Sequence, residues 1–228
     1  MRRLIIERAA IRSNMAVIKE RAQKAALYGV VAGEGGGVGT VRLARLLRDE
    51  GVTRFGVNSV SEARQLREAG FETEEILMLR STVDREELEQ LVDLSVVCTV
   101  SSVDTGLALN AVAENRSTVA EAHIQVDTGL GFGGFLISEP EKILLAYRSL
   151  PNVALSGIYT QLHAISGKSQ EISSQLKQFQ QVLEAIQALP QLQGKTFTYS
   201  TDTEQFDLIS TPLSSLQRMM DAAVAGIA

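Results

Sequence analysis

Short apolar runs rich in β-branched residues alternate along the chain with longer segments whose apolar residues recur every three or four positions. The short runs are typical of buried strands, and the longer spacing is typical of one helix face. The apolar runs predict strands at 27–32, 54–58, 75–79, 95–100, 120–127, 154–162, 196–201 and 222–228. The clearest helical face lies within 173–189 and comprises Leu176, Phe179, Val182, Leu183, Ile186 and Leu189.

Segment 59–70 carries the local signals of a complete helix. Ser59 is a typical N-cap residue, Glu62 stands in the first turn, and Gly70 is a typical C-terminal stop. A helix is also expected at 8–25, before the first strand. In a closed sheet, that helix would cover the gap left because nothing follows the last strand.

Eight strands that alternate with helices predict a parallel sheet with helical crossovers. We expect closure into a (β/α)8 TIM barrel that forms one domain over 1–228, with an open doubly wound sheet as the alternative. No Pro/Ser-rich linker or block of charge indicates a second domain. The reactive groups of such a barrel lie at the carboxyl ends of its strands.

The amino-acid composition limits the classes of binding partner that we expect. The 228 residues are 45% hydrophobic, carry a net charge of −5 and contain no basic patch interleaved with aromatic residues, so nucleic acid and anionic membranes are poor partners. No apolar run approaches the roughly 20 residues of a membrane span, and the N-terminal run is too short for a signal peptide. The single cysteine, Cys98, sits in an apolar run, which predicts a buried thiol in a cytoplasmic protein.

A glycine-rich loop, Gly-Glu-Gly-Gly-Gly-Val-Gly at 33–39, follows the first predicted strand and precedes a helical pattern. Glycine at such a junction often lets the backbone approach a phosphate. However, the loop lacks the Gly-Lys-Ser/Thr ending of a P-loop, and Val38 breaks the G-x-G-x-x-G spacing. Taken alone, the loop is compatible with a nucleotide site and with a flexible turn.

From about residue 5 onward the chain resembles the N-terminal barrel of the alanine racemase family. The members of this family are fold-type III isomerases that use pyridoxal phosphate (PLP). The matching stretches are IERAAIRSN, VVAGEGGGVGTVRLARLLRDEGVTRFGVNSVSEARQLREAG, ILMLRST, HIQVDTGLGFGGF, LSGIYTQLH and AVAGIA. The resemblance implies a TIM barrel whose mouth holds PLP.

Carried over residue by residue, the resemblance implies that most cofactor contacts are replaced. The lysine that forms the Schiff base corresponds to Ala32, and the tyrosine that contacts the phosphate corresponds to Gly36. In strand five, a lysine corresponds to Gln125, and the arginine near the phenolic oxygen corresponds to Phe132.

The last strands show the same loss. The phosphate-binding serine of the family corresponds to Thr201 and Asp202, and a carboxylate there would repel a phosphate dianion. The arginine at the pyridine nitrogen corresponds to Val224. No part of the sequence matches the family's C-terminal domain, which supplies the opposing catalytic tyrosine.

We therefore expect no bound cofactor and no racemase activity. The interpretation is a redesigned or degenerate scaffold with a widened small-molecule pocket, and the clustering of changes at strand ends favours deliberate redesign. Two alternatives stay open: an enzyme of altered mechanism with Glu34 or His163 as general base, and residual amino-acid racemisation. The barrel mouth is also a candidate surface for self-association.

The expected pocket residues come from several strand ends: Val38, Gln125, Asp127, Gln161 and Thr201. Asp127 also has a simpler interpretation, as a scaffold residue that holds a turn. Glu34, Asp127, His163 and Asp202 come from four different strands, but no closely spaced ligand pair accompanies them, so we expect no metal. Asp202 and Glu204 could equally cap the helix expected to follow them.

Overall fold

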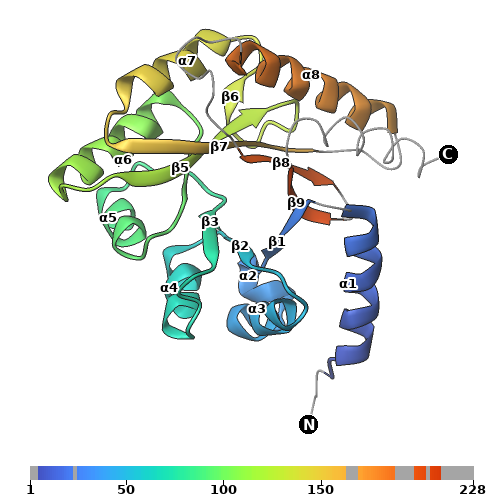
Figure 1. The fold of residues 1–228 in the computed structure, drawn as a ribbon. Helices are drawn as coiled ribbons and strands as arrows, with labels where there is room; N and C mark the ends of the chain where they lie inside the picture. The colour runs from blue at the N-terminus through green and yellow to red at the C-terminus, as the bar shows by residue number, and fades with distance from the viewer. Residues whose placement is uncertain (1–4, 23–24, 163–168, 188–197, 204–205, 212–228) are drawn as a thin grey trace.

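The computed structural model describes residues 5–22, 25–162, 169–187, 198–203 and 206–211, the last two segments by their backbone. Eight strands form a closed ring in the order β3-β2-β1-β9-β8-β7-β5-β4 (Figure 1). Seven of them run parallel to one another: β1 (Ala26–Val30), β2 (Arg54–Val57), β3 (Glu75–Met78), β4 (Cys98–Val100), β5 (Ala120–Asp127), β7 (Val153–Gln161) and β8 (Thr198–Thr203).

The ring closes between β3 and β4. The Val97 N–H donates to the carbonyl of Ile76 over 2.8 Å, and the Met78 N–H donates to the carbonyl of Val97 over 2.9 Å. Leu77 and Val97 are parallel bridge partners at this point. The predicted barrel is therefore confirmed, and the open doubly wound sheet is excluded.

The eighth place in the ring differs from the prediction. It is taken by β9 (Phe206–Thr211), which pairs antiparallel with both β8 and β1. Only two residues separate β8 from β9, too few for the crossover that a parallel strand needs. The strand expected at 222–228 lies outside the described residues. A two-residue strand, β6 (Phe135–Leu136), pairs with β5 off the ring and was not predicted.

Helices cover the outside of the ring (Figure 1). They are α1 (Arg8–Ala22), α3 (Thr40–Asp49), α4 (Val60–Glu68), α5 (Arg85–Asp93), α6 (Val103–Asn115), α7 (Pro140–Ser149) and α8 (Ser169–Gln187), with a short turn labelled α2 (Ala32–Gly36) after β1. The Ser59 side chain accepts the Glu62 N–H over 3.2 Å, which confirms the predicted cap. The predicted face of α8 is buried at Leu176, Phe179, Val182, Leu183 and Ile186, whereas Leu189 lies outside the described residues.

Successive strand residues point alternately outward and inward, which produces two apolar layers. The outer layer joins the sheet to the helices, for example through Phe55 of β2 and Leu66 of α4. The inner layer consists of strand residues alone, with its buried members at Tyr28, Leu77, Val97 and Tyr159. Cys98 belongs to the outer layer, and its burial raises the pKa of the thiol to about 12, as expected of an inert cysteine.

Polar groups also lie inside the ring. The Tyr159 hydroxyl lies 2.9 Å from the Thr99 hydroxyl, which in turn donates to the carbonyl of Met78 over 2.7 Å. His123 of β5 is 2% exposed and pairs in register with Gly157 of β7. A Cβ atom on Gly157 would stand only 2.5 Å from the His123 ring, so glycine provides the space that the imidazole occupies.

We predict that Gly157→Ala lowers the free energy of unfolding by about 1–3 kcal/mol, because the new methyl group would overlap the rigid, buried ring of His123 and force it to shift. Gly106→Ala in α6 is the control: its new methyl would meet the flexible end of Leu150 at 2.7 Å. The gain in helix propensity of about 1 kcal/mol offsets that contact. Urea denaturation of both variants tests the contrast, and equal midpoints would contradict it.

Candidate functional site

The carboxyl ends of the parallel strands meet at one end of the barrel, which we call the mouth. Ala32 stands there, two residues after the end of β1. Gln161 of β7 and Asp202 of β8 are register partners, so the structure brings these two predicted residues together. Thr201 lies in the same strand, whereas His163, Glu204 and Val224 lie outside the described residues.

The glycine-rich loop after β1 is a left-handed turn. Gly33, Glu34 and Gly35 have φ values of 62°, 55° and 57°, and the Gly35 N–H closes the turn on the carbonyl of Val31 over 3.1 Å. Glycine adopts this conformation without steric cost, whereas other residues rarely do. The backbone shape of the turn therefore explains its glycine content without any bound ligand.

Six N–H groups of the loop, those of Gly33, Glu34, Gly35, Gly37, Val38 and Gly39, are already used within the chain. Gly33 donates to Oε1 of Glu62 over 2.7 Å, and the N–H of Glu34 reaches the same oxygen at 3.4 Å. Other N–H groups donate to carbonyl groups of the loop itself: Gly37 and Gly39 to Glu34, and Val38 to Gly35. The loop thus binds an anion, and that anion is the carboxylate of Glu62.

Glu62 holds two strand ends together. It is 7% exposed in the first turn of α4, and its Oε2 accepts the Asn58 N–H at the end of β2 over 2.9 Å. The Ser-x-x-Glu pattern at 59–62 is a capping-box signature, in which the glutamate would bond the N-cap N–H. The Ser-x-x-Glu pattern thus indicates the cap, but it does not indicate that the same carboxylate fixes the glycine loop.

Glu34 does not lie in the apolar surroundings that a general base would need. Its side chain is exposed, and it is the non-glycine residue within the left-handed turn. The main-chain carbonyl of Glu34, and not its side chain, bonds within the loop, where it accepts the N–H groups of Gly37 and Gly39. Ala32, by contrast, is half-buried, as expected for a residue at the strand end.

Asp127 holds a second glycine-rich turn at the mouth. Its Oδ1 accepts the N–H groups of Gly129 and Gly131 over 2.8 and 3.1 Å. The scaffold role proposed for Asp127 is thereby confirmed. The same turn exposes Phe132 by 78%, while Gln125 is buried on the inner face of β5.

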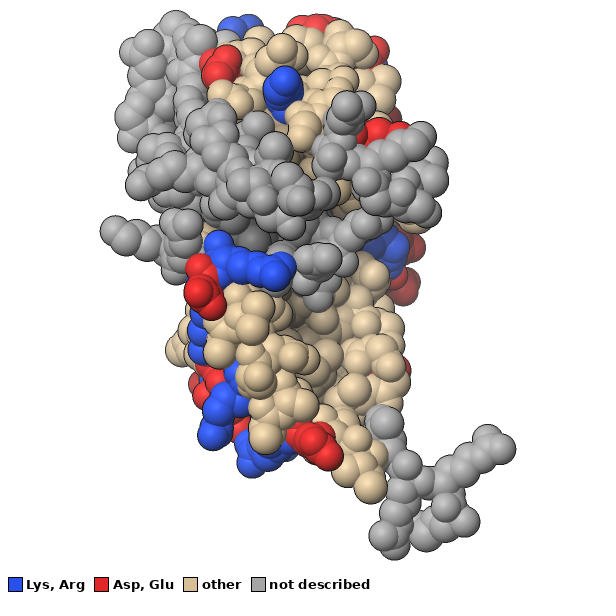
Figure 2. All heavy atoms as spheres, turned by 90° about the vertical axis from the view of Figure 1, so that its right-hand side faces the viewer, with Lys and Arg blue, Asp and Glu red and all other residues tan. Residues whose placement is uncertain are grey.

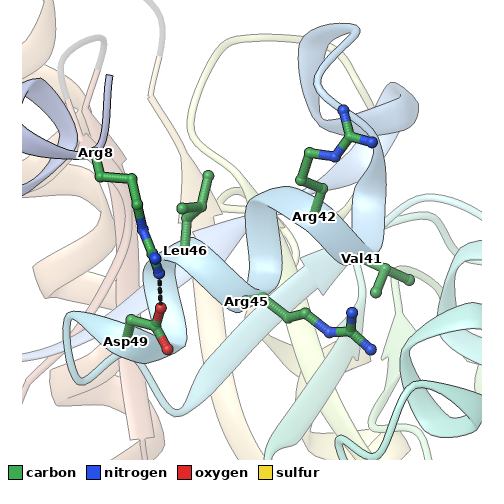
Figure 3. A pocket seen from close by; sticks show the side chains of 6 residues that line it. All are labelled: Arg8, Val41, Arg42, Arg45, Leu46 and Asp49. Carbon is green, nitrogen blue, oxygen red and sulfur yellow. Dashed lines mark hydrogen bonds and ion pairs between the residues drawn. The ribbon is translucent and has the colours of Figure 1, made fainter. Parts of the chain in front are cut away.

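A cavity of about 370 Å³ lies away from the mouth, between α1 and α3 (Figure 3). It is lined by Arg8, Val41, Arg42, Arg45, Leu46 and Asp49, so none of the predicted pocket residues contributes to it. Arg8 is paired with Asp49, and the side chains of Arg42 and Arg45 point in different directions (Figure 3).

The face around this cavity is of mixed charge. Basic and acidic side chains are interspersed on the side of the molecule where α1 lies (Figure 2). A second pair, between Arg12 and Glu50 at 3.3 Å, also joins α1 to α3. The helix expected to cover a gap in the ring is thus tied to its neighbour, and the cavity lacks the converging cations of an anion site.

The part of the chain that the structure describes contains neither a candidate metal site nor a helix that could span a membrane. No three His, Cys, Asp or Glu side chains in these ranges are grouped so that they could hold a metal ion. No helix within them has the length and apolar character needed to cross a bilayer.

Comparison with known proteins gives a consistent result. Residues 6–209 match the family model described as alanine racemase, N-terminal domain. The alanine racemase of Clostridium novyi (strain NT) is 32% identical over 176 residues, which are 76% of this chain and 45% of that protein. The chain spans about half the length of the curated relatives it matches.

Solved structures show the same fold. The alanine racemase from E. faecalis superimposes with a TM-score of 0.70 at 27% identity, over 88% of this chain and 53% of that one. The alanine racemase from Bartonella henselae with covalently bound pyridoxal phosphate has a TM-score of 0.73 at 22% identity, over 89% of this chain and 59% of that one.

We predict that Glu62→Gln destabilises the protein by about 1–3 kcal/mol. The amide has only one acceptor oxygen, so it can accept the N–H group on one side of the bridge, while its own NH2 group faces the N–H group on the other side without an acceptor. Glu68→Gln on the exposed face of α4 is the matched control and should leave stability unchanged within about 0.5 kcal/mol. Urea denaturation and hydrogen exchange at Gly33 and Asn58 measure the effect. Unchanged exchange at both amides would remove Glu62 from its bridging role.

Proposed function

The chain belongs to the family of the alanine racemase N-terminal domain, and we propose that it is a member without PLP chemistry: a (β/α)8 barrel whose mouth binds a small molecule without a covalent cofactor. The observation that carries this proposal is the end of β1, where Ala32 occupies the position that the resemblance assigns to the cofactor-binding lysine. A methyl group cannot form an imine.

The lysines on the described helices do not replace the missing amine. Lys19, Lys142 and Lys177 lie on α1, α7 and α8, the helices that cover the outside of the ring. A covalent link at the mouth needs an amine within bonding distance of the aldehyde. The position of these helices, on the outside of the ring, supports a barrel in which none of the three serves this purpose.

The phosphate group would also fit poorly at the glycine loop. The N–H groups that could receive it bond to Glu62 and to carbonyl groups of the loop. A phosphate dianion at the same donors would be repelled by the Glu62 carboxylate. The residues of this loop therefore do not fit the phosphate of PLP.

Several uncharged groups at the mouth suit a polar ligand. Ser81 and Ser101, after β3 and β4, are joined by a 2.7 Å hydrogen bond, and Gln161 is exposed at the end of β7. Such groups orient hydroxyl and amide functions without supplying charge. Exposed Phe132 adds apolar surface, through which we propose that the mouth also self-associates.

The pattern of change supports redesign or degeneration of a pocket on an intact scaffold. The replaced positions Ala32, Gly36 and Phe132 lie in the segments that follow β1 and β5, whereas Glu62 and Asp127 still hold the turns in those segments. Both apolar layers are complete in the described residues. A barrel that retains its turns and layers can lose cofactor contacts without losing its fold.

We predict that the native protein incubated with PLP and reduced with borohydride acquires no pyridoxyl group at the mouth and does not convert L-alanine to D-alanine. Peptide mapping by mass spectrometry and a chiral assay measure the two outcomes. Stoichiometric labelling of one lysine at the mouth, with racemisation, would overturn the proposal.

Two variants calibrate the labelling experiment. Ala32→Lys returns an amine to the strand end, but because the phosphate fits poorly beside Glu62 we expect no more labelling at residue 32 than at an exposed lysine elsewhere. Val119→Lys places an amine on an exposed position just before β5, at the opposite end of the barrel. Equal labelling of the two lysines would show that the mouth no longer concentrates the aldehyde, whereas selective labelling at 32 would identify the missing amine as the decisive loss.

A further inference from the structure

A second polar cluster lies inside the barrel, at the amino-terminal end opposite the mouth. Arg54 of β2 is in register with Tyr28 of β1 on one side and with Glu75 of β3 on the other. Across the ring, β5 contributes Glu121 and His123. Their strand neighbours belong to the outer layer, so alternation directs these five side chains inward.

Arg54 is the centre of this cluster. Its Nε lies 3.7 Å from Oε2 of Glu75, and its guanidinium lies 5.6 Å from the centre of the Tyr28 ring. Burial lowers the pKa of Arg54, but arginine stays charged at any ordinary pH. The Arg54 guanidinium is therefore a permanent positive charge within the cluster, and the protonation of His123 depends on it.

Glu75 is poorly satisfied as a carboxylate. Its Oε1 is buried without a hydrogen-bond partner among the described residues, and Glu121 places a second carboxylate close to it. Glu121 is stabilised separately, by the Ser156 hydroxyl at 2.8 Å. Burial, and then the negative charge of Glu121, raise the pKa of Glu75 to about 7.

His123 is poorly placed to be a cation. It is 2% exposed, its Nδ1 has no partner among the described residues, and its ring packs over the backbone of Gly157. Burial, and then the positive charge of Arg54, lower the pKa of His123 to about 4. The imidazole is therefore neutral at physiological pH.

We propose that the amino-terminal end of the barrel is a proton-binding centre in which Glu75 takes up a proton on folding, so that barrel stability decreases as the pH rises through neutrality. A neutral carboxyl group removes the repulsion between Glu75 and Glu121, and it takes negative charge off the buried Oε1, which has no hydrogen-bond partner among the described residues. Among the described side chains, the titratable and charged groups of the other strands that belong to this cluster or to the inner layer beside it are Tyr28, Arg54, Glu121, His123 and Tyr159.

Glu75 and His123 have opposite effects on how the stability of the barrel depends on pH. Glu75 binds its proton more tightly in the folded state, so its contribution is complete below pH 4.5 and is lost as the pH rises through about 7. His123 resists protonation in the folded state, so its contribution is complete above pH 6.5 and is lost as the pH falls through about 4. The two slopes largely cancel below pH 6.5, and above it Glu75 acts alone.

The test is the urea midpoint of the full chain as a function of pH. We expect the native midpoint to fall between about pH 6.5 and 8, and the Glu75→Gln midpoint to stay level there. Below pH 6.5, Glu75→Gln should lose stability on acidification, because His123 is no longer balanced. Glu72→Gln, an exposed carboxylate just before β3, is the matched control and should keep the native profile.

A second variant and a direct titration separate proton binding from a merely structural role. Glu121→Gln retains Glu75 but removes its negative neighbour, so the midpoint of the native decline should move to lower pH. Carboxyl ¹³C titration of the native protein should give Glu75 a midpoint near neutrality, a readout that does not depend on whether any variant folds. A Glu75 midpoint below pH 5, or a decline that persists unchanged in Glu75→Gln, would overturn the proposal.

Discussion

Closure of the sheet is the constraint on which the rest of the structure depends. Once β3 pairs with β4 through Val97, every strand acquires an inner face that only other strands can cover. The small interior is filled by a few large side chains, above all Tyr28 and Tyr159. Where the imidazole of His123 must also fit, the facing strand has Gly157. A strand residue without a side chain is thus a direct consequence of filling a closed ring.

The same closure brings the strand ends to a common rim, and there a single carboxylate joins two of them. Glu62 accepts N–H groups from Gly33 and from Asn58, which belong to the segments that follow β1 and β2. A left-handed turn has no regular partner for its first N–H groups, and burying them unpaired would cost about 1–3 kcal/mol each. The internal anion removes this cost, so the turn needs no external phosphate to be ordered.

Sequence patterns predicted what depends on local periodicity and missed what depends on closure. The strand at 120–127 and the apolar face of α8 follow from alternation and from helical spacing, and both agree with the structure. β9 was missed because its direction is set by the two-residue connection to β8, which periodicity does not encode. Glu75 and His123 were missed, because the burial and the neighbouring charges that shift their pKa values, Glu121 and Arg54, arise only when the ring closes.

In the candidate site, too, some features could be predicted from the local sequence and others depend on the folded structure. The resemblance located Ala32, and the turn-holding role of Asp127 could be read from the glycines that follow it. The surroundings of Glu34 could not be read, because they depend on three consecutive positive φ values that expose its side chain. Scaffold turns held by Glu62 and Asp127 do not rely on a ligand. The loss of cofactor contacts that we propose at the rim is therefore compatible with preservation of the fold, since separate residues would carry the two properties.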